Sequence, residues 1–234
     1  MQKARFYISP YFVFKRQLLM DLEKVAGKYR FTGSLLDIGC GEKPYKKLFP
    51  LVKYIGIDFN KYSKNKDISQ GRPDYYFDKS YLENGKLPFK SSSFNVVTLF
   101  QVLEHVKFPS KTLAETSRVL KSGGYVILTF PFLWPMHEAP HDYFRYTEYG
   151  IRELVSNLEL KQIEIIRQGS VFSAISIIMN EYLSNFASKN KLNYIISIIS
   201  YPLFLIFQYV SIILDKVFKS DTIFTNYLII LQKC

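Results

Sequence analysis

Apolar and polar residues alternate along the first 170 residues with two different periods, one typical of strands and one of helices. Short, almost continuous apolar runs predict strands that are buried on both faces. These runs lie at residues 34–39, 53–58, 73–78, 94–100, 125–130 and 159–168. Helical spacing predicts helices near residues 10–28, 111–120 and 147–157, and we expect Gly123-Gly124 to end the second of them. Strands that alternate with helices predict an α/β fold with a mostly parallel sheet covered on both faces.

The last predicted strand is separated from the others by a long apolar insertion. Residues 226–232 read as a buried strand, whereas residues 192–214 contain no charged side chain. As a helix, that uncharged run would be about 34 Å long, close to the thickness of a bilayer's hydrocarbon core. Residues 171–187 form another apolar stretch, interrupted by Asn180 and Glu181. Lysines flank the uncharged run at positions 189, 191, 216 and 219.

A single membrane crossing conflicts with the position of the last strand, because strands on opposite sides of a membrane cannot pair. If residues 226–232 complete the sheet, residues 171–221 must leave and return on the same side. Pro202 and the scattered polar residues favour a helical hairpin or helices lying in the interface of an anionic membrane. Helices that cover the sheet, a homodimer interface and a true span are the alternatives.

Composition allows one substantial core with an addition. The chain has 234 residues, 48% of them hydrophobic, and a net charge of +11. We expect a lead-in at 1–32, a main domain at 33–170 and 222–234, and the apolar insertion at 171–221. Two cysteines exclude a disulfide framework, and the first residues lack the pattern of a secretory signal, so we expect a cytoplasmic domain, peripheral at the inner face of the membrane.

A glycine turn follows the first strand in Leu35-Leu-Asp-Ile-Gly-Cys-Gly-Glu-Lys-Pro-Tyr45. Gly39 and Gly41 let the backbone approach a ligand closely, and the Asp37 carboxylate suits a cationic cofactor. A dinucleotide site would have its third glycine where this chain has Pro44, which argues against NAD and FAD. Asp58 ends the second strand, where an acid that binds a ribose is expected.

Four segments resemble successive motifs of class I S-adenosylmethionine-dependent methyltransferases: LLDIGCG, YIGID, FNVVTLFQVLEHV and RVLKSGGYVILTFP. The resemblance covers roughly residues 33–170 and is closest to the small-molecule branch with the ubiquinone and sterol methyltransferases. A looser likeness is to members linked to bacterial cell-surface glycan and lipid synthesis. Lys43, Asn95 and Ser122 depart from the usual motifs, although none of them removes a cofactor-binding carboxylate.

The resemblance implies a Rossmann-like, seven-stranded sheet with an antiparallel last strand, and S-adenosylmethionine as cofactor. It implies that Gly39 and Gly41 line the methionine part and that Asp58 binds the ribose hydroxyls. Asp78 would reach the adenine amine, with an ordinary surface aspartate as the equal alternative. The cofactor-binding residues that we expect are Asp37, Gly39, Cys40, Gly41, Asp58, Phe59, Asp78 and Gln101.

All three histidines lie in predicted loops that face the crevice beyond the carboxyl ends of the strands. His137 and His141 are the better candidates for a base that takes a hydroxyl proton, with Asp142 or Glu138 to orient them. His105 belongs to a recurrent motif and has the weaker claim. The alternative is that these side chains only hold the loop in shape.

The same loop provides candidates for binding the acceptor. Arg145 suits an acceptor phosphate, and Trp134 and Tyr143 are candidates for the pocket wall, with plain aromatic packing as the alternative. We expect no metal site, because Pro140 interrupts a helix that could present His137 and His141 together.

These observations together predict methyl transfer from S-adenosylmethionine to a hydroxyl of a small membrane-associated, lipid or glycan precursor. A catalytically silent, cofactor-binding module of a membrane assembly is the first alternative. RNA methylation is the second, since the charge would suit it. The chain has no Asn/Asp-Pro-Pro-Tyr-like motif after the fourth strand, which argues against a nucleic-acid substrate.

Overall fold

The computed structural model describes residues 7–59, 72–78 and 86–234. Its helices are α2 (Phe12–Tyr29), η1 (Lys46–Leu48), η3 (Leu103–His105), α4 (Pro109–Val119), α5 (Glu148–Val155), α6 (Val171–Ala187) and α7 (Lys191–Val217). Its strands are β1 (Gly33–Ile38), β2 (Val52–Phe59), β3 (Tyr75–Phe77), β4 (Phe94–Phe100), β5 (Leu120–Pro131), β6 (Leu160–Gln168) and β7 (Asn226–Lys233).

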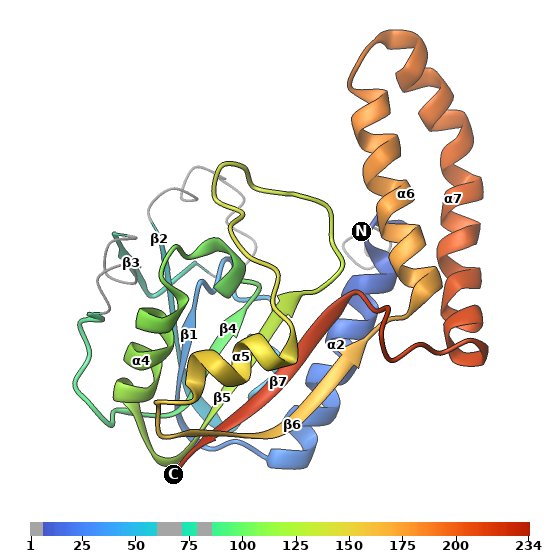
Figure 1. Ribbon diagram of the computed structural model, residues 1–234. Coiled ribbons are helices and arrows are strands. Elements are labelled where there is room, and N and C mark those ends of the chain that lie inside the picture. Colours follow the sequence, from blue (N-terminus) through green and yellow to red (C-terminus); the bar gives the residue numbers. More distant parts are fainter. Residues whose placement is uncertain (1–6, 60–71, 79–85) are drawn as a thin grey trace. The chain divides into compact units, whose positions relative to one another are not determined.

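The seven strands form one sheet in the order β3-β2-β1-β4-β5-β7-β6, which confirms the predicted fold class (Figure 1). The pairs β1–β2, β1–β4, β2–β3 and β4–β5 are parallel. Thr225 donates to the Gln168 carbonyl, and Cys234 donates to the Glu159 carbonyl at the other end of the same pair. The last strand therefore runs antiparallel to β6, as the resemblance implied.

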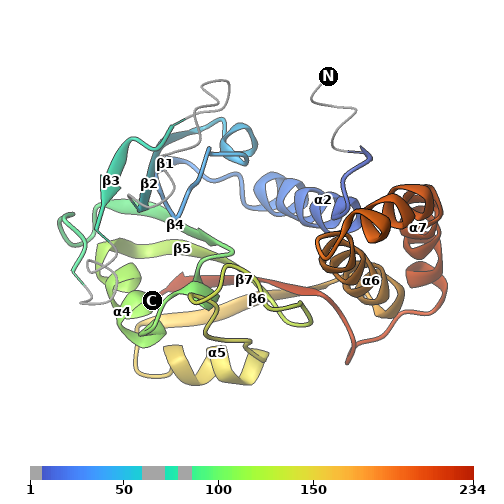
Figure 2. The ribbon, with the colours of Figure 1, turned by 90° about the horizontal axis from the view of Figure 1, so that it is seen from above.

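The central strands are buried on both faces, as their nearly continuous apolar sequences predicted. Leu35, Leu36 and Ile38 of β1 are fully buried, and β4 is buried from Val96 to Phe100. Helices α4 and α5 lie on one face of the sheet, and the second half of α2 lies on the other (Figure 2). This arrangement leaves the carboxyl ends of the parallel strands to carry the loops of the site.

The start of β5 differs from the sequence prediction. Gly123 and Gly124 do not terminate a helix but lie inside β5, which begins at Leu120. The β4–β5 register shifts between Phe94 and Val96, and Gly123 has a φ of +75°. A Cβ on Gly124 would lie 2.8 Å from the Lys121 carbonyl oxygen. The glycine pair thus allows a bulge that a residue with a side chain would block.

The chain divides into two compact units, each described here by itself. One contains Asp21–Pro131, His137–Ile166 and Tyr227–Cys234, and therefore most of the sheet. The other contains Phe132–Met136, Arg167–Asn226 and, of Met1–Met20, the described residues 7–20. The domain boundaries expected from the sequence, at 33, 170 and 222, stay a prediction.

Helices α6 and α7 form an antiparallel hairpin (Figure 1). At its base, Asp215 accepts hydrogen bonds from the backbone N–H groups of Ser170, Phe172 and Ser173 at 2.9–3.1 Å. Ser170 makes no side-chain cap of its own for α6. The carboxylate at the end of one helix therefore satisfies the amides that begin the other and complements the dipole of α6.

The buried residues of the hairpin are mostly small or polar, with Ile177 as the exception, whereas many of its exposed residues are large and apolar. The buried residues of α7 are Gln208 and Ser211, and those of α6 are Ser173, Ala174, Ser176, Ile177 and Asn180. Asn180 donates to the Ser176 carbonyl, and Gln208 donates to the Ser9 carbonyl. By contrast, large aliphatic side chains cover the outer surface of α7, where Ile199 is 72% exposed. A helix of a water-soluble protein normally buries its apolar stripe, so this hairpin is inverted.

Helix α7 also has the length and composition of a helix that could cross a membrane. Its most apolar window of 18 residues has a mean hydropathy of 1.9, and only 11% of that window is buried. The low burial sets it apart from the core helix of a water-soluble domain, which passes the same test of composition.

Candidate active site

The glycine turn after β1 has the conformation that its sequence predicts. Gly39 and Gly41 have φ values of +70° and +48°, in the left-handed region that favours glycine. A Cβ on Gly39 would lie 2.5 Å from Val102, so the close packing there excludes a side chain. A Cβ on Gly41 would have no atom of the described residues within 4 Å. The backbone at Gly41 thus faces open space that a ligand can enter.

Asp58 lies directly against this turn. Its carboxylate accepts hydrogen bonds from the backbone N–H groups of Gly41, at 2.5 Å, and Phe59, at 2.6 Å. The residue is only 7% exposed, and desolvation raises the pKa of the carboxyl although the two amides oppose the shift. Each carboxylate oxygen can accept a further hydrogen bond. The side chain is therefore held in one orientation with acceptor capacity for a pair of hydroxyls.

Asp37 is the more deeply buried of the two acids, with 1% exposure. It accepts hydrogen bonds from the hydroxyls of Thr98, at 2.7 Å, and Tyr54. Burial raises its pKa to about 7, against the effect of both hydroxyls. The sequence analysis missed these partners, although Thr98 is the one polar residue in the run Val96–Phe100. A cation beside Asp37 would favour its charged form.

Lys43 occupies the place of the family's usual third glycine. Its φ is +57°, so the backbone keeps the left-handed conformation that a glycine would adopt there. The side chain is turned inward, and its Nζ lies 2.7 Å from Asp74 Oδ1. Asp74 also accepts the backbone N–H of Gly56 at 2.7 Å. This departure from the motif thus links the glycine turn to the segment between β2 and β3.

The remaining cofactor candidates take different positions. Cys40 is buried, which raises the pKa of its thiol and keeps it uncharged. Gln101 has a φ of +56°, and its side chain donates to Thr129 Oγ1 at 3.1 Å. Phe59 ends β2 beside Asp58, and Asp78 is exposed one residue beyond β3. The cofactor contacts of these residues stay predictions.

The structure brings two of the three histidines together. His105 lies in η3, directly after β4, and its ring centroid is 4.8 Å from that of His137 in the loop after β5. His105 Nδ1 lies 2.8 Å from the His141 carbonyl oxygen. The His141 ring is directed to Tyr143, whose hydroxyl lies 3.0 Å from Nδ1. His105, which had the weaker claim from sequence, is therefore the partner of His137.

An ion pair fixes the loop that carries His137. Arg145 binds both oxygens of Asp142, at 2.5 and 2.8 Å, and Asp142 also accepts the backbone N–H of His137 at 2.9 Å. The Arg145 hydrogen bonds lower the pKa of Asp142 to about 2. Asp142 Oδ2 lies 3.3 Å from His137 Nδ1, as expected for a residue that orients this ring. The guanidinium that we expected to bind an acceptor phosphate is thus engaged by Asp142.

Glu104 is a buried acid that the sequence analysis did not single out, although it adjoins His105. Its side chain is inaccessible to solvent, and burial raises its pKa to about 8. Tyr143 donates its backbone N–H to the Glu104 carbonyl, and the Tyr146 hydroxyl donates to the carbonyl of Leu103. These bonds join η3 to the loop after β5 and hold the histidines in place.

The histidines and Asp58 belong to the same region. Glu138 Oε2 lies 4.0 Å from His105 Nε2, and the Glu138 charge also raises the pKa of Asp58. The glycine turn, its acids and the histidines thus lie at the carboxyl ends of the strands, where the sequence predicts a crevice. Trp134 instead packs against Tyr11 and Phe14 in the unit with the hairpin, and its role as a pocket wall stays a prediction.

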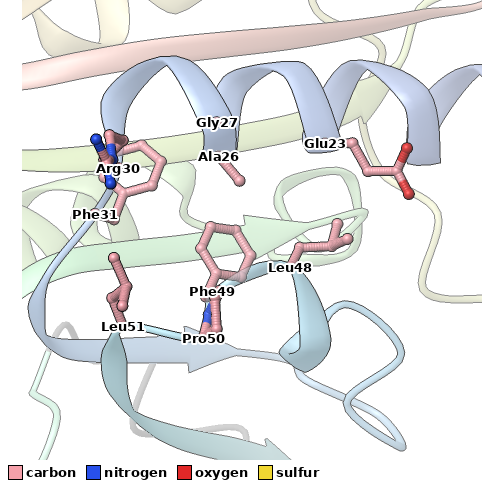
Figure 3. A pocket seen from close by; sticks show the side chains of 9 residues that line it. All are labelled: Glu23, Ala26, Gly27, Arg30, Phe31, Leu48, Phe49, Pro50 and Leu51. Atoms are coloured by element: carbon pink, nitrogen blue, oxygen red, sulfur yellow. The ribbon is translucent and has the colours of Figure 1, made fainter.

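A separate cavity of about 270 Å³ lies near the amino ends of β1 and β2 (Figure 3). Its lining comes from the second half of α2 and from the segments before these two strands, and it includes Arg30, Phe31 and Phe49. Ligands of parallel sheets bind at the opposite edge. The cavity is therefore distinct from the candidate active site.

The strand order, the glycine turn after β1 and the acid after β2 define a class I methyltransferase fold. Residues 36–128 match the family model of the methyltransferase domain. The chain therefore contains a class I S-adenosylmethionine-dependent methyltransferase domain, and S-adenosylmethionine is its cofactor. These findings confirm the family and the cofactor inferred from the sequence motifs.

The similarity to known proteins is concentrated in this domain. An uncharacterised methyltransferase of Schizosaccharomyces pombe is 32% identical over 107 residues, which cover 41% of this chain and 38% of that protein. The mitochondrial ubiquinone biosynthesis O-methyltransferase of Candida albicans is 32% identical over 109 residues, or 41% of this chain and 32% of that protein. The chain thus spans well under half the length of either relative.

A solved structure shows the same fold over most of the chain. The (4+2)-cyclase SpnF aligns with a TM-score of 0.58 at 14% identity, over 92% of this chain and 81% of that one. Since that protein is a cyclase, the fold alone does not define the reaction.

The residues of the turn fit the cofactor. Open space lies beside Gly41, the Asp58 carboxylate has acceptor capacity for ribose hydroxyls, and Asp37 offers negative charge to a cation. Because Asp37 must lose its proton to interact well with a cation, we expect the affinity for S-adenosylmethionine to rise with pH. Below about pH 7 it should fall by up to about tenfold for each pH unit.

Isothermal titration at pH 6 and pH 8 would measure this dependence. Asp37→Asn, which cannot titrate, should remove most of it, and S-adenosylhomocysteine, which lacks the sulfonium charge, should show less of it. Equal slopes for the wild type and Asp37→Asn would contradict the assignment of Asp37.

Proposed function

We propose that the protein transfers a methyl group from S-adenosylmethionine to a hydroxyl of a small acceptor that is held in or at a membrane, such as a lipid or a lipid-linked glycan precursor. The inverted packing of the α6–α7 hairpin is the observation that carries this proposal. Its polar interior and apolar exterior suit an environment of lipid rather than water.

Charge supports the same location. Lys189 and Lys191 lie where the two helices join, and Lys216 and Lys219 lie at the other end of α7. Basic residues at the ends of an apolar element attract anionic head groups. We therefore place the protein at the inner face of an anionic membrane, where lipid-linked acceptors are found.

The chemistry requires few groups from the protein. The cofactor, when bound, supplies an electrophilic methyl group on a sulfonium. Gly41 and Asp58 hold and orient the cofactor, and a base must accept the proton that the acceptor hydroxyl loses. His137, oriented by Asp142, and His105, oriented by the His141 carbonyl, are the candidates for that proton. Positioning and removal of water supply the rest of the rate enhancement.

Transfer of labelled methyl from S-adenosylmethionine to separated lipid, soluble and RNA fractions of host cells tests the proposal. We expect label in the lipid fraction with the wild type and at least tenfold less with Asp37→Ala. Label in the RNA or soluble fraction would overturn the membrane acceptor. An absence of label despite measured cofactor binding would favour a catalytically silent module.

A further inference from the structure

Three side chains of metal-ligand type lie together at the carboxyl end of β4. Glu104 and His105 come from η3, and His137 comes from the loop after β5. One potential ligand atom from each residue lies within 4.8 Å of those of the other two. Glu104 and His105 are adjacent in sequence, but His137 is far from both, so no spacing motif predicted the cluster.

Glu104 shows what the cluster lacks. The residue is fully buried, and neither carboxylate oxygen has a hydrogen-bond partner among the described residues. His105 Nε2 lies 3.9 Å from Glu104 Oε1, which is too long for a hydrogen bond. Buried carboxylates are normally paired, hydrogen-bonded or bound to a metal. A cation between Glu104 and the histidines would satisfy this requirement.

The hydrogen bonds of His105 prepare it for such an ion. A carbonyl oxygen can only accept a hydrogen bond, so the 2.8 Å contact makes Nδ1 of neutral His105 the donor to the His141 carbonyl and places the ring proton on Nδ1. The lone pair is then on Nε2, the atom that lies near Glu104 and Glu138. A backbone carbonyl on the far nitrogen is the usual way to orient a metal-binding imidazole.

His137 is oriented in a comparable way. Its Nδ1 lies 3.3 Å from Asp142 Oδ2 and 3.4 Å from Arg145 Nη2, so the charged pair holds this side of the ring. One nitrogen of the His137 ring is among the three potential ligand atoms of the cluster. Arg145 is neutralised by the two oxygens of Asp142, which reduces its repulsion of a nearby cation.

We propose that Glu104, His105 and His137 bind a divalent transition-metal ion, with zinc as the best fit. Two imidazoles and one carboxylate suit zinc better than magnesium or calcium, which prefer oxygen ligands. Zinc bonds of about 2.1 Å need ligand atoms about 3.4 Å apart, so binding would draw the widest pair together by about 1.4 Å.

The proposed site would leave one coordination position for a small oxygen ligand. Zinc with three protein ligands keeps an open fourth position. An acceptor hydroxyl bound there would lose its proton more readily, because the ion stabilises the resulting oxyanion. The two histidines would then act as ligands rather than as bases. This inference concerns metal binding and stands independently of the identity of the acceptor.

Titration of the metal-free, full-length protein with Co²⁺, followed by its visible absorption, tests the site. We expect the wild type to bind one ion with the bands of a tetrahedral site. Glu104→Gln, His105→Gln and His137→Gln should each weaken binding at least tenfold. His141→Gln is the matched control, because it removes an imidazole from the same loop but not from the cluster, and it should bind Co²⁺ as the wild type does.

Folding and cofactor binding are measured on the same samples. Circular dichroism identifies any variant that fails to fold. If Glu104→Gln does not fold, His105→Gln and His137→Gln still test the site. Zn²⁺ should also raise the Tm of the wild type and of His141→Gln but not that of His105→Gln. The proposal would be overturned if the wild type bound no Co²⁺, or if all three cluster variants bound Co²⁺ as tightly as the wild type does. Neither the cofactor nor the acceptor enters this titration, so its failure is distinct from a failure of the proposed methyl transfer.

Discussion

Replacement of Asp58 by alanine is expected to abolish most of the affinity for S-adenosylmethionine. We predict that the carboxylate accepts hydrogen bonds from the ribose hydroxyls, and it also accepts the Gly41 amide. Two hydrogen bonds to a charged group are together worth about 3–4 kcal/mol, which corresponds to a loss of about 150- to 1,000-fold. Equilibrium dialysis with labelled cofactor would measure the loss.

Asp78→Ala is the comparison for this substitution, because it removes an exposed acid that lies one residue beyond β3. It also tests the expected contact with adenine, for which a loss of about tenfold is expected. Thermal unfolding separates lost binding from lost structure, since Asp58 also accepts the Phe59 amide. Wild-type affinity in a folded Asp58→Ala protein would rule out the ribose assignment.

Replacement of three apolar residues on the outer face of α7 by lysine is expected to release the protein from lipid vesicles. Ile199, Leu203 and Ile206 follow each other at helical spacing and are 59–72% exposed, so their replacement leaves no cavity. Burial of each in lipid contributes about 1.5–3 kcal/mol. The triple lysine variant should therefore bind vesicles at least about a thousandfold more weakly. Flotation with vesicles of neutral and anionic phospholipid would measure this loss. The assay is done at high salt, because the attraction of the added lysines to anionic lipid is then screened.

The control carries the same three charges elsewhere. Leu51, Phe108 and Tyr149 are exposed apolar residues of the unit that contains most of the sheet, and their replacement by lysine should leave flotation unchanged. Undiminished flotation of the α7 variant would exclude the hairpin as the membrane-binding element. The hairpin would instead be a homodimer interface if the wild type were a dimer that does not float and the α7 variant were a monomer.

Much of the fold follows from local sequence, because each strand carries its own pattern. The run from Phe94 to Phe100 matched β4 residue for residue, and the acid–glycine turn at Asp37–Gly41 was identified before any contact was known. The backbone conformation at Gly39 depends mainly on neighbours in sequence. The burial of β1 requires only a hydrophobic core, which any α/β fold has. Gly123 and Gly124 were misjudged because a glycine pair suits both a helix end and a bulge, and only the pairing of β4 with β5 decides between them.

The sequence by itself determined the class of domain, its cofactor, the acids beside the glycine turn and the presence of an uncharged apolar segment. Only the tertiary structure decided that Glu104 and His105 meet His137, that Thr98 and Tyr54 hold Asp37, and that Lys43 pairs with Asp74. It also decided which side of the apolar helices faces inward. Motifs and periodicity depend on how each residue affects its own segment of backbone. The contacts named above join residues from different strands and loops, and the order of strands in the sheet decides which of these lie close together.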